Sequence, residues 1–364
     1  MGRPYANEMS ELADTFSWAA KTDIKPLRRA VRTAGSSPLR AIGSGGSLTV
    51  GYALAGFHQR LAGRLGAVAT PLEATNEPID TNVSTWLIST SGSNVDILAA
   101  AKACVVHEPR QFAVLCGRLK SPLVEFCRSH PFSDLLLYPQ LAGKDGFLAT
   151  NSLLGFTALL ARAYVLEFGQ GEQDWSAAVE VVQSLLSDGS EILATWEKST
   201  NLLWERPTTV VLHGPSTRIG AINLESKFTE AALSNLQLAD FRNFAHGRHH
   251  WLAKRGTESA VLAFVTEEDR ALEDWTLALI PADIPRARLE LAGSSIATTL
   301  GALVAALRLT GWAGAARGID PGRPSVPDFG RKLHRLSPGH SARIVYPEKL
   351  TKRDAAAIER KSGM

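Results

Sequence analysis

The chain has 364 residues, of which 39 are Lys or Arg and 36 are Asp or Glu, giving a formal net charge of +3. Apolar residues make up 45% and charged residues 21%, which is typical of a globular protein and excludes a disordered or fibrous one. The length predicts two domains, and the near balance of charge argues against a nucleic-acid partner.

The small net charge hides a basic carboxyl-terminal segment. Positions 331–364 hold nine basic and three acidic residues, which leaves 30 basic and 33 acidic residues in positions 1–330. One interpretation is a solvated tail, and the other is a lid that brings cations to an anionic substrate. We expect the lid over Arg331–Arg335 and the solvated tail beyond Pro338.

Cysteine usage and hydropathy indicate the cellular compartment. The three cysteines form no Cys-x-x-Cys pair, which favours buried thiols in a reducing compartment. The first residues lack the apolar stretch of a signal peptide, and no run of about 18 uncharged apolar residues predicts a membrane span. We therefore expect a cytoplasmic protein without a membrane partner.

The first half of the chain alternates between helical and strand patterns. Helical spacing over 7–32, divided near Pro26, is followed by predicted strands at 39–42, 65–70, 86–88, 112–116 and 135–138 and predicted helices at 50–61, 95–104 and 150–167. Such alternation is typical of βαβ units around a parallel sheet.

After a polar stretch at 169–174 the alternation restarts, with predicted strands at 209–212, 260–264 and 276–280 and predicted helices at 219–233 and 295–309. We therefore expect an α/β protein with two doubly wound, three-layer α/β/α domains whose sheets are mainly parallel. The expected boundaries are an amino-terminal helical arm (1–34), a first domain (35–168), a linker with a connecting helix (169–206), a second domain (207–320) and a basic closing segment and tail (321–364).

The segment Ser89–Asn94 lies between a predicted strand and the start of a helix. Unpaired N–H groups at a helix amino terminus attract phosphate, and the hydroxyl groups of Ser89, Thr90 and Ser91 add donors. The segment lacks the Gly-Lys-Ser/Thr of a nucleotide P-loop. Because Ser, Thr and Asn are also common helix caps, ordinary capping is the alternative.

A second glycine-rich loop, Gly43–Ser47, follows the strand at 39–42. It matches only part of the dinucleotide-binding pattern, because Leu48 stands where the third glycine belongs and no acidic residue ends the next strand. Two polar loops after neighbouring strands instead predict one small, hydroxyl-rich anionic ligand. We therefore expect no nucleotide cofactor.

At these residues the sequence resembles the sugar isomerase (SIS) family, specifically its tandem-domain members, over about residues 10–335. Gly43–Ser47 resembles the family's first sugar-binding loop, and Ser89–Asn94 is similar to its phosphate loop. The resemblance implies a phosphosugar substrate, a homodimer and two SIS domains. It implies these substrate-binding residues: Ser44, Gly45, Ser47, Ser89, Thr90, Ser91 and Asn94.

In the second half, Lys227-Phe-Thr-Glu230 followed by His246-Gly247 is similar to the isomerase half of glucosamine-6-phosphate synthases. The resemblance implies that Glu230 moves a proton between two adjacent sugar carbons, that Lys227 assists it, and that His246 opens the ring. Gly318–Pro321 and Lys332 resemble the family's closing segment, which supplies a lysine near the sugar. Arg248 departs from the synthases, which have proline there, and we expect no glutaminase domain ahead of the first SIS unit.

The residues themselves allow this chemistry and also simpler alternatives. Lys227 and Glu230 lie three apart on a helix and can interact, and a carboxylate beside a lysine stays ionised, as a base must. The alternative is a surface ion pair. The imidazole of His246 can donate or accept a proton, although with His249 and His250 it also suggests metal ligands. No Cys or carboxylate accompanies them at ligand spacing, so we expect no metal.

These features predict an enzyme that carries out aldose–ketose isomerisation, or deamination or deglycation of an amino-sugar phosphate, by C1–C2 proton transfer. The alternative is a non-catalytic phosphosugar sensor or regulatory protein. A sensor needs the 89–94 loop but has no use for Lys227, Glu230 and His246 together, which favours the enzyme.

Overall fold

A computed structural model describes residues 2–334 and shows two parallel sheets. The first sheet has strand order β2-β1-β3-β4-β5 and the second has β7-β6-β8-β9. The strands are β1 (Leu39–Ile42), β2 (Gly66–Ala69), β3 (Ser84–Ser89), β4 (Gln111–Cys116), β5 (Ser133–Leu137), β6 (Thr208–His213), β7 (Asn235–Asp240), β8 (Ser259–Thr266) and β9 (Arg286–Leu291). The predicted fold class, an α/β protein with two mainly parallel sheets, is confirmed.

Helices connect the strands. In the first half they are α1 (Tyr5–Met9), α2 (Leu12–Lys21), α3 (Lys25–Ala34), α4 (Gly46–Leu61), α5 (Pro71–Asn76), α6 (Val95–His107), α7 (Pro122–Arg128) and α8 (Asn151–Phe168). In the second half they are α9 (Glu172–Leu186), α10 (Glu191–Thr200), α11 (Arg218–Glu230), α12 (Phe241–Asn243), α13 (His250–Arg255), α14 (Arg270–Ala278), α15 (Ser295–Arg317) and α16 (Asp328–His334). Three shorter helical turns are η1 (Asn201–Glu205), η2 (Phe244–Arg248) and η3 (Gly256–Glu258).

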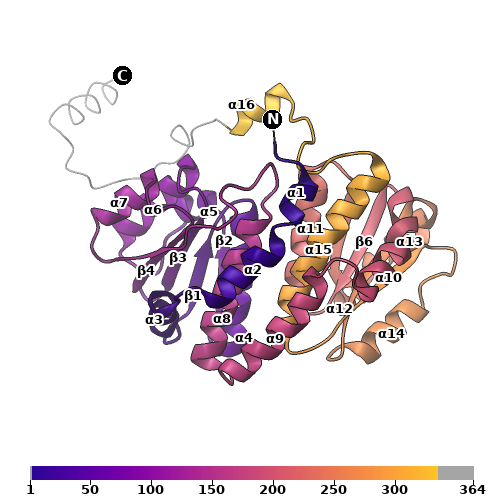
Figure 1. Ribbon diagram of the computed structural model, residues 1–364, viewed down its shortest axis with the longest axis horizontal. Helices are drawn as coiled ribbons and strands as arrows, with labels where there is room; N and C mark the ends of the chain where they lie inside the picture. The colour runs from indigo at the N-terminus through magenta and orange to yellow at the C-terminus, as the bar shows by residue number, and fades with distance from the viewer. Residues whose placement is uncertain (1, 335–364) are drawn as a thin grey trace.

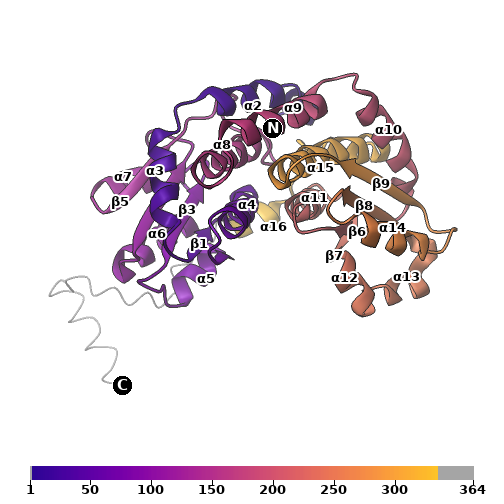
Figure 2. The same ribbon diagram turned by 90° about the horizontal axis from the view of Figure 1, so that it is seen from below.

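The two sheets flank a central layer of helices. Helices α4 and α8 face α11 and α15 across the middle of the molecule (Figures 1 and 2). The largest hydrophobic cluster runs through this layer, joining Trp86 and Ile88 of the first sheet to Leu262 and Phe264 of the second. Each sheet also has a smaller hydrophobic cluster on its outer face. Sharing one core fixes the position of one sheet relative to the other.

Covering both faces of each sheet explains the strand sequences. Every residue of β3, β4, β6 and β8 is buried, because parallel strands with helices on both sides have no solvent-facing side. Such strands read as continuous apolar runs, and the sequence locates them correctly.

The predicted strand at 276–280 is wrong, because Thr276 belongs to helix α14, where its hydroxyl donates to the carbonyl of Leu272 at 2.7 Å. The actual strands β7 and β9 were not predicted. Both lie at the edges of the second sheet, and their sequences, Asn-Leu-Gln-Leu-Ala-Asp and Arg-Ala-Arg-Leu-Glu-Leu, are too polar to read as buried strands. Short apolar runs do not distinguish strand from helix, whereas edge strands tolerate charge.

Helix α15 is, among the described residues, the one that is long and apolar enough to cross a membrane. In its most apolar stretch 83% of the residues are buried inside the protein, where it packs on α11, α9 and α8. Its apolar character is therefore accounted for by the core.

Candidate functional site

The two glycine- and serine-rich loops lie side by side. Strands β1 and β3 pair in parallel, with Ile42 opposite Leu87, so the loops that follow them leave the same edge of the sheet. Gly45 ends the first loop with φ +54°, a conformation that favours glycine, and begins α4 without a side-chain cap. The adjacency predicted from the sequence is present.

Hydrogen bonds within the segment Ser89–Asn94 give it a fixed shape. The Ser89 hydroxyl accepts the N–H of Gly92 at 3.0 Å. The Asn94 side-chain oxygen accepts the N–H groups of Asp96 and Ile97 at 2.7 and 3.3 Å and so caps α6. Asn94 therefore has the helix-capping role that was the alternative to ligand binding, and only its amide nitrogen is left for a ligand.

Gly92 explains why this turn needs a glycine. Its φ is +62°, and a Cβ added there would lie 2.2 Å from the Ser121 hydroxyl oxygen and 3.0 Å from Cys116 Sγ. The turn thus rests directly on the neighbouring β4–α7 connection, with the side chains of Ser91 and Ser93 exposed. The Ser91 hydroxyl accepts both the N–H of Ser93 at 3.3 Å and the Ser93 hydroxyl at 3.0 Å, so these two exposed side chains are held together at the surface of the turn.

A third segment, Asp145–Ser152, joins this edge and was not recognised as part of the site from the sequence. The Asp145 carboxylate accepts the backbone N–H groups of Thr150, Asn151 and Ser152, each at 3.1 Å, and thereby caps α8. A Cβ added to Gly46 would lie 2.3 Å from Ala149 Cβ, so this segment contacts the Gly43–Ser47 loop. The sequence signal that could have identified this segment is the polar run that precedes the apolar helix α8.

Lys227, on the last turns of α11, is fully buried, and its ammonium group has no hydrogen-bond partner in the described part of the chain. Burial lowers the pKa of Lys227, while the nearby carboxylates of Glu230, Asp145 and Glu8 act to raise it. Helix α11 packs against α4 of the first domain, so Lys227 lies on a helix at the junction between the two sheets. An unpartnered buried ammonium is costly, and such groups concentrate at functional sites.

Lys227 and Glu230 do not share a face of α11. Glu230 is exposed and accepts the Ser226 hydroxyl at 2.5 Å, whereas Lys227 points into the protein. The surface ion pair considered as an alternative is absent, because one partner is buried and the described ion pairs include no contact between the two. Lys227 and Glu230 therefore interact only electrostatically over a distance, and their side chains are not in contact.

His246 lies near the carboxyl end of strand β7, whereas Lys227 and Glu230 lie near its amino end. It follows the carboxyl end of β7 in the turn η2, where Gly247 has φ +103° and Phe244 packs on the outer face of the sheet. Helix α11 returns on the inner face and ends next to the amino end of β7. Within one chain the exposed His246 is therefore not brought to the other candidates.

Lys332 is exposed on the short helix α16, beyond the turn at 318–323. Of the expected lid, Arg331 pairs with Asp328, and Arg335 and the predicted solvated tail lie outside the described residues. No three His, Cys, Asp or Glu side chains within residues 2–334 come together as possible metal ligands. All three cysteines are buried and unpaired.

Comparison with solved structures shows which known fold this arrangement matches. The C-terminal domain of glucosamine-fructose-6-phosphate aminotransferase from Francisella tularensis aligns with a TM-score of 0.66 and 14% identity, covering 87% of this chain and 96% of that one. Tagatose-6-phosphate ketose/aldose isomerase from Escherichia coli aligns with a TM-score of 0.69 and 15% identity, covering 90% and 98%. The chain has the tandem sugar isomerase fold.

A third structure with this fold is glucosamine-6-phosphate deaminase from Thermotoga maritima, with a TM-score of 0.67 and 16% identity over 88% of this chain and 97% of that one. No protein-family model and no curated protein sequence matches the chain. The resemblance indicated by the loop and helix motifs is thus confirmed as a likeness of fold.

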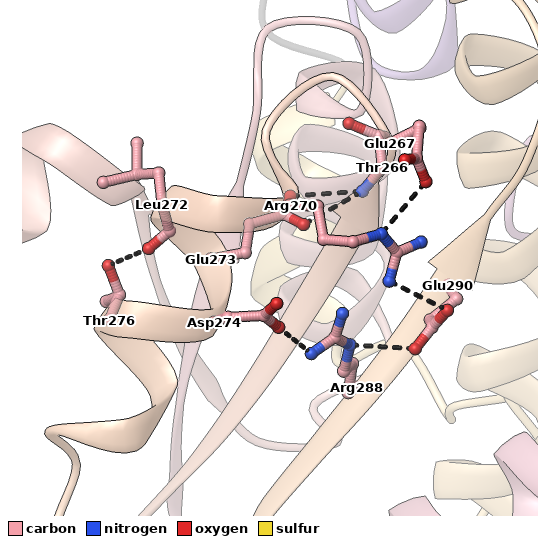
Figure 3. A network of polar contacts seen from close by, with 9 residues as sticks. All are labelled: Thr266, Glu267, Arg270, Leu272, Glu273, Asp274, Thr276, Arg288 and Glu290. Carbon is pink, nitrogen blue, oxygen red and sulfur yellow. Dashed lines mark hydrogen bonds and ion pairs between the residues drawn. The ribbon is translucent and has the colours of Figure 1, made fainter.

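In the second domain, carboxylates occupy the equivalent end of the sheet. At the end of β8, which corresponds in strand order to β3, the buried Glu273 carboxylate accepts the Thr266 N–H at 3.1 and 3.2 Å (Figure 3). Asp269 lies against the β6–α11 loop, since a Cβ on Gly214 would lie 2.0 Å from its Oδ2. Carboxylates at this position disfavour a bound phosphate.

Burial raises the pKa of Glu273 to about 7, so this carboxylate gives stability a predictable pH dependence. Folding favours the protonated form, and its stabilising effect is complete below the ordinary pKa of about 4.5 and is lost as pH rises through 7. We expect Glu273→Gln to be more stable than the wild type at pH 8 by up to about 3 kcal/mol, since each pKa unit corresponds to about 1.4 kcal/mol.

Urea unfolding of both proteins at pH 5 and pH 8 measures the effect. The exposed Glu267→Gln in the same network is the control, with no change of pH slope expected. Equal pH slopes for wild type and Glu273→Gln would show that Glu273 does not titrate as stated.

Proposed function

We propose that this chain binds a phosphorylated sugar at the carboxyl ends of β1 and β3 and moves a proton between its C1 and C2 carbons. The observation that carries the proposal is the fully buried, unpartnered ammonium of Lys227 on α11, the helix that packs against α4 of the first domain. A desolvated cation at the junction of two domains stabilises negative charge that develops on a bound substrate.

Each substrate group has a partner of suitable chemistry. The phosphate binds the hydroxyl and N–H groups of Ser89–Asn94 at the amino terminus of the 13-residue helix α6. The sugar hydroxyl groups bind Ser44, Gly45 and Ser47 in the adjacent loop. Lys227 stabilises the oxyanion of the enediol or enolamine intermediate, and the exposed Glu230 carboxylate takes the proton from C2 or C1.

The position of His246 makes the site depend on a second copy of the chain. Its place beyond the carboxyl end of β7, away from Lys227 and Glu230, supports a role in the site of a partner subunit. We infer a homodimer in which each His246 acts on the sugar of the other protomer, with Lys332 closing over it, and a cytoplasmic setting in which sugar phosphates occur.

A non-catalytic phosphosugar sensor is the second candidate. Its support is that Glu230 bonds to Ser226 at 2.5 Å and makes no contact with Lys227. A sensor keeps the phosphate loop and has no need of an oriented base, so solvent-facing Glu230 is compatible with it.

Titration calorimetry with glucosamine 6-phosphate, fructose 6-phosphate and tagatose 6-phosphate, followed by NMR of each sugar after incubation in D2O, tests both functions. Binding with deuterium entering C1 or C2 supports the enzyme, and released ammonia identifies deamination. Binding without deuterium supports the sensor. Absence of binding to every sugar phosphate would refute both.

A further inference from the structure

Glu8 is a fully buried carboxylate that the chemistry above does not use. Its Oε1 accepts the N–H of Gly146 at 2.6 Å, and its Oε2 accepts the Thr150 hydroxyl. Its main-chain oxygen accepts Nδ2 of Asn151 at 3.0 Å. One residue of the amino-terminal arm therefore holds both ends of segment 146–151.

The fit between Glu8 and this segment is close. A Cβ added to Gly146 would lie 2.1 Å from Glu8 Oε1, so only glycine lets the carboxylate approach. The same segment reaches the sugar-binding loop through the contact of Ala149 with Gly46. Glu8 is thus connected to the Gly43–Ser47 loop through this one segment.

The arm that carries Glu8 is anchored on the other domain. The Tyr5 hydroxyl donates to the Leu307 carbonyl at 2.9 Å, and the Tyr5 N–H donates to Asp320 Oδ1 at 3.0 Å. Arg323 Nε donates to the Gly2 carbonyl at 2.7 Å. Helix α1 therefore links α15 and the 318–323 turn of the second domain to a loop of the first.

The charges around Glu8 point to the same junction. Burial raises the pKa of Glu8, with Asp145 adding to the effect and the Thr150 hydroxyl, the Gly146 N–H and Arg3 opposing it. The Glu8 and Asp145 carboxylates also act to raise the pKa of Lys227, the buried cation on α11. Glu8 therefore contributes to the charge environment of this ammonium group as well as holding the segment.

We propose that Glu8 is a positioning residue for the sugar site, which fixes the 146–151 segment against the Gly43–Ser47 loop by bonding to Gly146 and Thr150 from an arm anchored on the second domain. The sugar-site part of this inference rests on the proposed function. The positioning itself does not, because it concerns the ligand-free chain.

Hydrogen–deuterium exchange of peptides spanning 145–152, in the full chain, tests the positioning. We expect Glu8→Ala to speed exchange in this segment at least tenfold. Glu8→Gln restores protection, because its amide oxygen accepts from Gly146 and its amide nitrogen donates to Thr150. Glu11→Ala is the matched control, since Glu11 lies on the same arm and pairs only with Arg3; exchange then stays at the wild-type rate.

The second readout compares the dissociation constant and kcat of wild type and variants, for whichever hexose phosphate the wild type binds. We expect Glu8→Ala to weaken binding about tenfold or more while kcat falls less, and Glu8→Gln to recover the affinity. Unchanged exchange in Glu8→Ala, or exchange that Glu8→Gln does not restore, overturns the proposal. If the wild type binds no sugar phosphate, the function fails while the exchange result still decides the role of Glu8.

Discussion

Replacement of Glu230 by Gln is expected to abolish turnover while leaving phosphosugar binding intact. General base assistance is typically worth about 10²–10⁴-fold in rate, and the amide cannot accept the carbon-bound proton. The side chain is exposed and bonded only to Ser226, so the substitution leaves the core undisturbed. The loss is therefore confined to kcat, with a dissociation constant within about threefold of wild type.

Deuterium incorporation at C1 or C2 is the most direct measurement, because it reports proton transfer even where the overall reaction is slow. Glu225→Gln is the matched control, since Glu225 lies on the same helix and accepts the Thr229 hydroxyl at 3.2 Å. The control is expected to keep wild-type exchange. Exchange surviving in Glu230→Gln would remove Glu230 as the base.

Sequence patterns were sufficient for the features that depend on neighbours along the chain. Strand β1 has the predicted bounds of 39–42, and the loops 43–47 and 89–94 lie at the ends of adjacent strands as expected. Buried strands followed by Gly and Ser residues carry this information locally. The two-domain architecture follows from the same alternation.

Features that depend on contacts across the fold were not predictable. Lys227 and Glu230 are three residues apart, yet one is buried and the other exposed, because α11 lies between its own sheet and the first domain. The bonds from Glu8 to Gly146 join residues 138 positions apart. His246 follows the edge strand β7, whose polar sequence does not predict a strand. The separation of His246 from α11 by this strand was therefore not predictable either.

The second large effect concerns Lys227, whose replacement by Met is expected to stabilise the chain while abolishing turnover. The ammonium is fully buried without a hydrogen-bond partner, so an apolar chain of similar volume removes a desolvation cost. The substitution also removes the positive charge that interacts with the Glu8 and Asp145 carboxylates, and this loss offsets part of the gain. We therefore expect a net stabilisation of about 1–2 kcal/mol, within the range for replacing buried charges by apolar groups.

The pH dependence separates this mechanism from simple repacking. Because burial lowers the pKa of Lys227 below its ordinary 10.5, the wild type gains stability as pH rises toward 10.5 and loses it as pH falls toward the lowered value. Lys227→Met lacks that contribution, so its advantage in urea unfolding shrinks from pH 7 to pH 10. The exposed Lys198→Met, on α10, is expected to change stability by less than about 0.5 kcal/mol at either pH. A destabilised Lys227→Met would show that the ammonium is retained for structure, whereas a stable and inactive one shows that it is retained for function at a cost in stability.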